Sequence, residues 1–305
     1  MIALLLAAAA SLAQPQTVLT IDPSHRIVEG VASDGTTIWV SSILDRQILA
    51  CTTTCRRLAT LPAPLHPFAI AWDETRKRLW VAADCPPGVP GIKPCDRGAL
   101  IGMTSSGRIM TRIAPPSGSF HPGDVSAAPA GVFASDSQNG AVYRLAKNGY
   151  SLAPVIAPGI GKSAQGTALD SDGQKLLVAD YGQGVGLIDL GSGQRTLLRR
   201  QDGKPLRGVD GLTRCGSVYY GIYNGSAPGA LLAMRVSGTG ISTSQPLGEV
   251  SLPDPTQVAF DGKRLLIVAN SGWASLDKPD FVRTAGTPII AVPLSADCTP
   301  DEAAR

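Results

Sequence analysis

The chain repeats one strand pattern six times, and this repeat constrains the fold more than any other feature. In each repeat a short apolar strand is followed by a turn and a second apolar strand that ends in a small polar group. The repeats read VEGVASDGTTIWVSS, PFAIAWDETRKRLWVAAD, PGDVSAAPAGVFASD, AQGTALDSDGQKLLVAD, VDGLTRCGSVYYGIYN and PTQVAFDGKRLLIVAN, with corresponding residues 39, 55, 42, 45 and 46 positions apart. Strand repeats of this length are typical of propeller blades. We therefore expect an all-β fold, a six-bladed β-propeller of four-stranded antiparallel blades.

The second strand of each repeat alternates large apolar residues with other residues. Ile38, Val40, Leu79 and Val81 follow this alternation, and we expect them to fill the space between blades. A third strand follows in the clearest repeats, for example in GAVYRLAKNG and GVGLIDLGSG. The segment TVLTID precedes the first repeat, and we expect it to supply the outer strand that completes the last blade.

The first residues, MIALLLAAAASLAQPQ, form a short apolar run that ends in small residues. Such a run is typical of a signal peptide and is shorter than a membrane anchor, which needs about 20 apolar residues. We expect residues 1–13 to be a signal peptide and residues 14–305 to form a single propeller domain. The alternative is a buried N-terminal strand. The predicted location is outside the cytoplasm, either periplasmic or secreted.

Six cysteines fall as two close pairs and two distant residues, Cys51/Cys55, Cys85/Cys95, Cys215 and Cys298. An even number in an exported chain favours disulfides in an oxidising compartment. Pairing of the distant Cys215 with Cys298 follows by elimination. The alternative is a metal site at the CxxxC pair, but no histidine lies near either close pair at zinc-ligand spacing.

The charge of the chain argues against a nucleic-acid partner. Its formal net charge is only +3, and no run of basic residues interleaved with aromatic residues occurs. We expect a monomer with no membrane span that binds a small molecule.

Antiparallel pairing places the start of each first strand and the end of each second strand on one face of the propeller. Around one mouth of the central channel the repeats therefore bring together the starting residues Glu29, Phe68, Gly123–Asp124, Gln165, Asp210 and Thr256–Gln257, and the ending residues Asp84, Asp136, Asp180, Asn224 and Asn270. Such a ring of oxygen-bearing side chains can either bind a cation or bond to backbone groups at the strand ends.

The stretches GDVSAAPAGVFASDSQNGAVYRL and AQGTALDSDGQKLLVADYGQGV, together with VDGL and IVANSGW, resemble the family of senescence marker protein, gluconolactonase and luciferin-regenerating enzyme. The resemblance spans roughly residues 25 to 295 and implies a six-bladed propeller, often a metal-dependent lactone hydrolase. It implies metal ligation by Glu29 and Asp210. The family usually has Asn where this chain has Gln165 and Gly123. Gln165 can still offer a carbonyl oxygen, and Asp124 can take the place of the second Asn.

The resemblance implies hydrolysis of a lactone or related ester, with a divalent metal, calcium or zinc, polarising the carbonyl. Asp210 is the candidate catalytic base, and Glu29, Asp124, Gln165 and Asp210 are the candidate metal ligands. The alternative is a non-catalytic propeller with a degenerate metal site that binds a small molecule or a protein partner at the same mouth. Both carboxylates would then only tie blades together.

Four further residues are candidates for substrate binding at this mouth. His66 and His121 each stand just before a first strand, and such a pair can bind a metal or serve as acid and base. Arg207 precedes the Asp210 motif and can guide an anionic substrate, and Asn270 ends the last repeat. The alternative is that the histidines satisfy backbone groups and Arg207 is a solvated loop charge. Trp39 and Trp80 alternate within strands and are expected to pack between blades.

Overall fold

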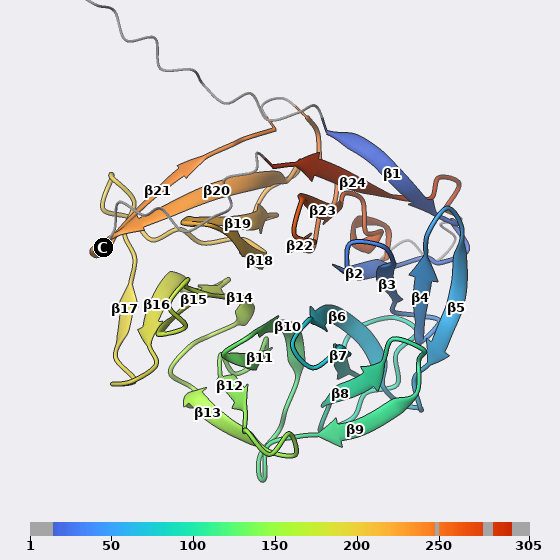
Figure 1. The fold of residues 1–305 in the computed structure, drawn as a ribbon, viewed down its shortest axis with the longest axis horizontal. Helices are drawn as coiled ribbons and strands as arrows, with labels where there is room; N and C mark the ends of the chain where they lie inside the picture. The colour runs from blue at the N-terminus through green and yellow to red at the C-terminus, as the bar shows by residue number, and fades with distance from the viewer. Residues whose placement is uncertain (1–14, 248–249, 277–282, 295–305) are drawn as a thin grey trace, which may run out of the picture.

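The chain forms a ring of six four-stranded antiparallel sheets in a computed structural model (Figure 1). The structure describes residues 15–247, 250–276 and 283–294. The predicted signal peptide and Cys298 lie outside the described residues. The six-bladed all-β propeller expected from the repeats is confirmed.

Each of the first five blades uses four consecutive strands, ordered from the channel outward. Blade one contains β2 (Val28–Ser33), β3 (Ile38–Ser42), β4 (Gln47–Cys51) and β5 (Cys55–Thr60). Blade two contains β6 (His66–Asp73), β7 (Arg78–Asp84), β8 (Ala99–Thr104) and β9 (Ile109–Ile113). Blade three contains β10 (Pro122–Ala128), β11 (Gly131–Asp136), β12 (Val142–Leu145) and β13 (Leu152–Ile156). Blade four contains β14 (Ala164–Leu169), β15 (Lys175–Asp180), β16 (Gly184–Asp189) and β17 (Arg195–Leu197). Blade five contains β18 (Val209–Cys215), β19 (Val218–Tyr223), β20 (Ala230–Ser237) and β21 (Gly240–Ser244).

The sixth blade closes the ring by combining strands from both ends of the chain. It contains β22 (Val258–Phe260), β23 (Arg264–Val268), β24 (Thr287–Pro293) and, as its outer strand, β1 (Gln16–Ile21). β1 pairs antiparallel with β24, with Ile21 opposite Thr287. The predicted role of TVLTID is therefore confirmed. The only helix of the described residues is a 3-10 turn, η1 (Trp273–Ser275), and none is long and apolar enough to cross a membrane.

The apolar core lies between the blades. Six clusters of buried side chains are found among the described residues, and each joins a pair of neighbouring blades. Ile38, Val40, Leu79 and Val81 are buried in these clusters, as predicted, and so are Trp39 and Trp80. Packing between blades leaves the first strands free to line the channel.

Two disulfides pin loops at the edge of the ring. Cys51 is bonded to Cys55 across the β4–β5 turn, and Cys85 is bonded to Cys95 across the Pro- and Gly-rich loop that follows β7. Both predicted short-range pairs are confirmed, and no cysteine of the described residues is a free thiol. The pairing of Cys215 with Cys298 involves a residue outside that part of the chain and stays a prediction.

Candidate active site

Glycines allow the first strands to approach one another closely at the predicted mouth. Glu29 and Gln165 are each followed by a glycine. A Cβ on Gly30 would lie 2.6 Å from a carbonyl oxygen of blade two, and one on Gly166 would lie 2.4 Å from the carbonyl oxygen of Asp210. Any larger residue would push neighbouring first strands apart. The glycines therefore set how closely the polar side chains of different blades meet at the axis.

Glu29 starts the first strand of blade one and faces other carboxyl groups. The indole Nε1 of Trp273, in η1, donates a hydrogen bond to its Oε2. Trp273 is stacked on Phe68 of blade two, with ring centroids 6.3 Å apart. Loss of hydration raises the pKa of Glu29 well above its usual range, and the negative charge of Asp210 raises it further. Both effects favour the protonated form of the Glu29 carboxyl.

Asp124 starts the first strand of blade three and is buried. Its Oδ1 accepts hydrogen bonds from its neighbour's backbone, Val125 N at 2.6 Å, and from Gln257 Nε2 of blade six at 2.8 Å. Burial, together with the charge of Asp210, raises the pKa of Asp124 to about 8. At neutral pH this carboxyl is also mostly protonated.

Asp210 is more acidic than Asp124 at the mouth. Its Oδ2 accepts a hydrogen bond of 2.8 Å from Asn224 Nδ2, which also donates to the carbonyl oxygen of Pro255 at 3.1 Å. Burial raises the pKa of Asp210 to about 6, and the Asn224 hydrogen bond opposes that rise. The Oδ1 of Asn224 is buried and has no donor among the described residues. An acceptor beside Asp210 is therefore available for a water or a substrate hydroxyl.

Gln165 fills the space that the family's second Asn would need. Its Nε2 donates to Ser163 Oγ at 3.1 Å. A Cβ on Gly123 would lie 3.0 Å from Gln165 Oε1 and 2.9 Å from the Cβ of Ser137. The two departures from the family pattern are thus spatially linked, since the longer side chain at one position takes the volume vacated at the other.

The described residues at the mouth contain no ready-made cluster of His, Cys, Asp and Glu side chains for a metal ion. No group of three or more His, Cys, Asp or Glu side chains in the described part of the chain lies close enough together to hold a metal ion. Glu29, Asp124 and Asp210 each accept a hydrogen bond from a protein N–H group instead. The predicted ligation by Glu29, Asp124, Gln165 and Asp210 stays a prediction, and the chemistry proposed below uses no metal.

The two predicted histidines take up other contacts. His66 Nδ1 donates to the carbonyl oxygen of Ile43 at 2.7 Å, which ties blade two to blade one, and burial lowers the pKa of His66. His121 Nδ1 lies 3.1 Å from Asp84 Oδ1. It lines a separate cavity of about 520 Å³ beside the Cys85–Cys95 loop. Neither contacts Asp210 or Glu29 by any hydrogen bond that links described residues.

No hydrogen bond among the described residues joins the side chain of Arg207 or Asn270 to the carboxyl groups. Arg207 is exposed on the loop before β18. The backbone oxygen of Asn270 accepts a hydrogen bond from Arg283. Sequence reasoning assigned Trp273 no role, although its indole holds Glu29. In the motif IVANSGW, Trp273 follows shortly after Asn270, which was predicted to end a strand at the mouth. This position in the sequence could have indicated that Trp273 lies near the mouth.

The arrangement as a whole is that of a six-bladed all-β propeller with a polar, acidic channel mouth. Solved structures share this fold. A gluconolactonase from Xanthomonas campestris is 19% identical over 94% of this chain and 93% of its own, with a TM-score of 0.64. A calcium-binding protein, regucalcin, from Agrobacterium tumefaciens is 16% identical over 92% and 95%, with a TM-score of 0.62.

A luciferin-regenerating enzyme also has this fold, with a TM-score of 0.59 at 13% identity over 91% of this chain and 95% of its own. No protein-family model and no curated protein sequence matches the chain. At these identities the likeness establishes the architecture that the sequence resemblance implied. The chemistry depends on the residues at the mouth, because one fold can carry many activities.

Proposed function

We propose that the protein hydrolyses a lactone or a related ester at the channel mouth that holds Glu29, Asp124 and Asp210. The observation that carries the proposal is the separation of pKa values within one group of interacting carboxyls. Asp210 has a pKa of about 6, while Asp124 has one of about 8 and the pKa of Glu29 is raised well above normal. Titratable neighbours with separated pKa values are typical of acid–base pairs.

In this proposal Asp210 is the general base. Its carboxylate accepts a proton from water as the water oxygen bonds to the carbonyl carbon, and the π electrons of the carbonyl move onto its oxygen. Protonated Glu29 donates a hydrogen bond to that oxygen from Oε1, because its Oε2 is already held by Trp273. When the intermediate collapses, the ester C–O bond breaks and the leaving alkoxide takes the proton from Asp210. The product is a hydroxy acid.

The fold supports the same substrate class, since solved structures with it include a gluconolactonase. Another solved structure with this fold is that of a calcium-binding protein, so each assay below includes an arm with added calcium.

We also propose that the protein is exported. The disulfides Cys51–Cys55 and Cys85–Cys95 support an oxidising compartment. We further propose that the protein acts as a monomer on a small molecule, without nucleic acid.

The test is hydrolysis of a panel of aldonolactones and acyl-homoserine lactones, followed by proton release. Wild-type protein is compared with Asp210→Asn, which keeps the size of the side chain and removes the base. A matched control is Asp172→Asn, an exposed turn residue outside the mouth. Each protein is assayed with chelator and with added calcium. The proposal predicts turnover that Asp210→Asn lowers about 100-fold or more and the control retains.

A second candidate function is binding without turnover at the same mouth. It is favoured by the hydrogen bonds that Trp273, Gln257 and Asn224 already donate to the three carboxyls. Absence of turnover across the panel in every metal arm would reject the hydrolase and leave this candidate. Titration calorimetry with the same lactones would then measure the binding.

A further inference from the structure

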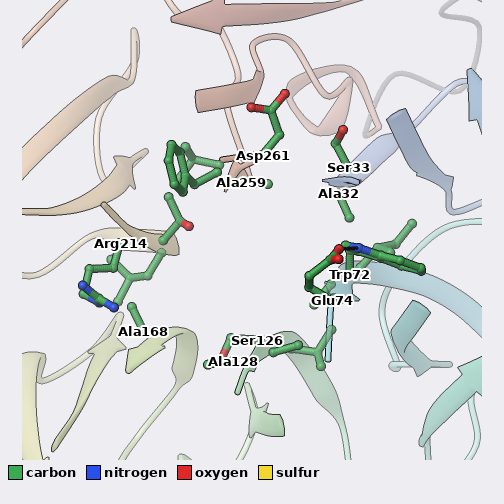
Figure 2. Close-up of a pocket in the computed structure, with 18 of the residues that line it drawn as sticks. Ala32, Ser33, Trp72, Glu74, Ser126, Ala128, Ala168, Arg214, Ala259 and Asp261 are labelled. Atoms are coloured by element: carbon green, nitrogen blue, oxygen red, sulfur yellow. Dashed lines mark hydrogen bonds between the residues drawn. The ribbon is translucent and has the colours of Figure 1, made fainter. Parts of the chain in front are cut away.

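A second cavity opens at the other end of the channel, away from the carboxyl groups. Its volume is about 520 Å³, and the far ends of the first strands line it. Figure 2 shows side chains from strands of several blades arranged around a common space. Residues such as Ala32, Ala168 and Ala259 form small apolar walls. The ring geometry leaves room there because these residues are small.

Gln257 separates this cavity from the carboxyl groups. It lines the cavity, its Oε1 accepts a hydrogen bond of 2.8 Å from the backbone N of Val31, and its Nε2 donates to Asp124. One side chain therefore ties blade six to blades one and three near the axis. Gln257 therefore lies between this cavity and the carboxyl of Asp124, and the cavity is lined by the opposite ends of the first strands.

An aromatic ring is fixed in place at the rim of the cavity. Trp72 stacks on Trp39 with ring centroids 5.0 Å apart. Its Nε1 donates to Glu74 Oε2 at 2.7 Å. A ring held on one face and at its edge keeps its orientation without a ligand, so little conformational entropy is lost on binding.

Arg214 lies across the cavity from Trp72 (Figure 2) and has no acidic partner among the described residues. Its Nε donates to the carbonyl oxygen of Leu169 at 2.6 Å, and its Nη1 donates to that of Gly216. No hydrogen bond within the described part of the chain uses its Nη2. The guanidinium is thus fixed by neutral carbonyls, with one nitrogen free to donate.

The acidic residues at the rim, in contrast, are already satisfied. Glu74 pairs with Lys77, and Asp261 pairs with Arg264 at 2.8 Å. Asp34 uses its Oδ1 to accept from the backbone N–H groups of Thr36 and Thr37 in its own turn. Asp34 likewise has no cationic partner among the described residues, but a carboxylate has no donor to offer. Arg214 is the cation that lines the cavity, and it keeps an unused N–H donor.

We propose that this cavity binds a small organic anion, with one carboxylate or sulfonate on an apolar, planar body. The anionic group would bond to Arg214, because guanidinium groups suit planar oxyanions. The apolar body would lie against Trp72 and the small residues of the wall. This site is separate from the proposed catalytic mouth and does not depend on it.

The test uses two fluorescent probes that share their rings and differ in charge. They are 1-anilinonaphthalene-8-sulfonate, an anion, and N-phenyl-1-naphthylamine, which is neutral. The full chain is titrated with each probe. We expect saturable binding of one anion per chain. Arg214→Gln should weaken anion binding about tenfold, the loss typical of a charge-assisted hydrogen bond. It should leave binding of the neutral probe within about twofold.

Two variants locate the effect. Trp72→Ala should weaken both probes, since it removes the shared apolar contact. Arg112→Gln, an exposed residue on the outer strand of blade two, should change neither. Equal anion affinity in Arg214→Gln and wild type would overturn the proposal, and so would an equal loss in Arg112→Gln. If Arg214→Gln loses both probes, Arg214→Lys decides the matter. Retained preference for the anion supports the site, and loss of that preference rejects it.

Discussion

Gln257 Nε2 and Asp124 Oδ1 lie 2.8 Å apart, although β22 and β10 belong to opposite blades of the ring (Figure 1). The bond crosses the channel and links residues 133 positions apart in the chain. It holds a carboxyl whose burial raises its pKa to about 8. The stability of the ring should therefore depend on whether the Asp124 carboxyl is protonated.

Asp124→Asn should make the protein more stable at pH 8 and change its stability little at pH 4. Because the pKa of Asp124 is higher in the folded chain than in the unfolded chain, the folded state keeps a proton that the unfolded state loses. The stability that this retained proton gives the folded state is fully present below about pH 4 and is lost as the pH rises toward 8. Asn keeps an acceptor for Gln257 and carries no charge.

The measurement is the melting temperature of both proteins from pH 4 to 9. We expect a gain of about 2 kcal/mol at pH 8, which corresponds to about 5 °C. The exposed variant Asp172→Asn serves as the control for a general charge effect. If the difference in melting temperature between wild type and Asp124→Asn stayed constant across this pH range, the result would contradict the raised pKa of Asp124.

The proposed activity should increase with pH through about 6. Asp210 acts as a base only when ionised, and burial raises its pKa to about 6. Below pH 5 the rate should fall about tenfold per pH unit. Asp210→Asn should lower kcat about 100-fold or more across the range, the usual contribution of a general base. The check is a pH–rate profile of kcat/KM, and an acid limb centred near pH 4 would assign the base to an ordinary, unperturbed carboxyl.

Gly166→Ala should destabilise the ring by about 2–4 kcal/mol, because inserting a methyl group where the backbone cannot move is costly. The added Cβ would lie 2.4 Å from the carbonyl oxygen of Asp210 and also 2.4 Å from Leu212 N. Gly191→Ala is the matched control, since its Cβ would come no closer than 3.5 Å to a neighbouring atom, Asp189 Oδ1. Urea unfolding measures both. Equal midpoints for the two variants would show that blades four and five can move apart freely.

The sequence predicted the blades well because each blade follows from local patterns. Alternation fixes which residues of a strand are buried, so Val40 and Leu79 could be placed between blades. Antiparallel pairing fixes which strand ends share a face, so Glu29 and Asp210 could be placed at one mouth. The closing strand β1 could be predicted because the segment TVLTID precedes the first repeat and belongs to none of the six.

Other features of the site depend on side-chain contacts that no local pattern encodes. The contact between Trp273 and Glu29 joins residues 244 positions apart. The position of His121 before its strand indicated the mouth, but no sequence pattern showed that its ring would lie 3.1 Å from Asp84 Oδ1. The apolar cavity with Arg214 lies at the end of the channel to which the polar strand ends do not point. Rotamer choice and turn conformation decide these contacts, and the repeat alone fixes neither.

Gly123 and Gln165 should show strong thermodynamic coupling. Gly123→Asn alone should destabilise the protein by about 2 kcal/mol, because its Cβ would lie 3.0 Å from Gln165 Oε1 and 2.9 Å from Ser137 Cβ. Gln165→Asn alone leaves a void beside Gly123 and should cost about 1 kcal/mol. The double variant lets a shorter amide share the space, so its cost should be at least about 1 kcal/mol below the sum of the single costs.

A double-mutant cycle from urea unfolding measures this coupling, and calorimetry with calcium on the same four proteins shows whether the paired Asn residues create cation binding. Gly123→Asn paired with Thr196→Ser, on the outer strand of blade four, is the control cycle and should be additive. Additivity of the Gly123 and Gln165 costs would mean that the two side chains do not compete for the same volume.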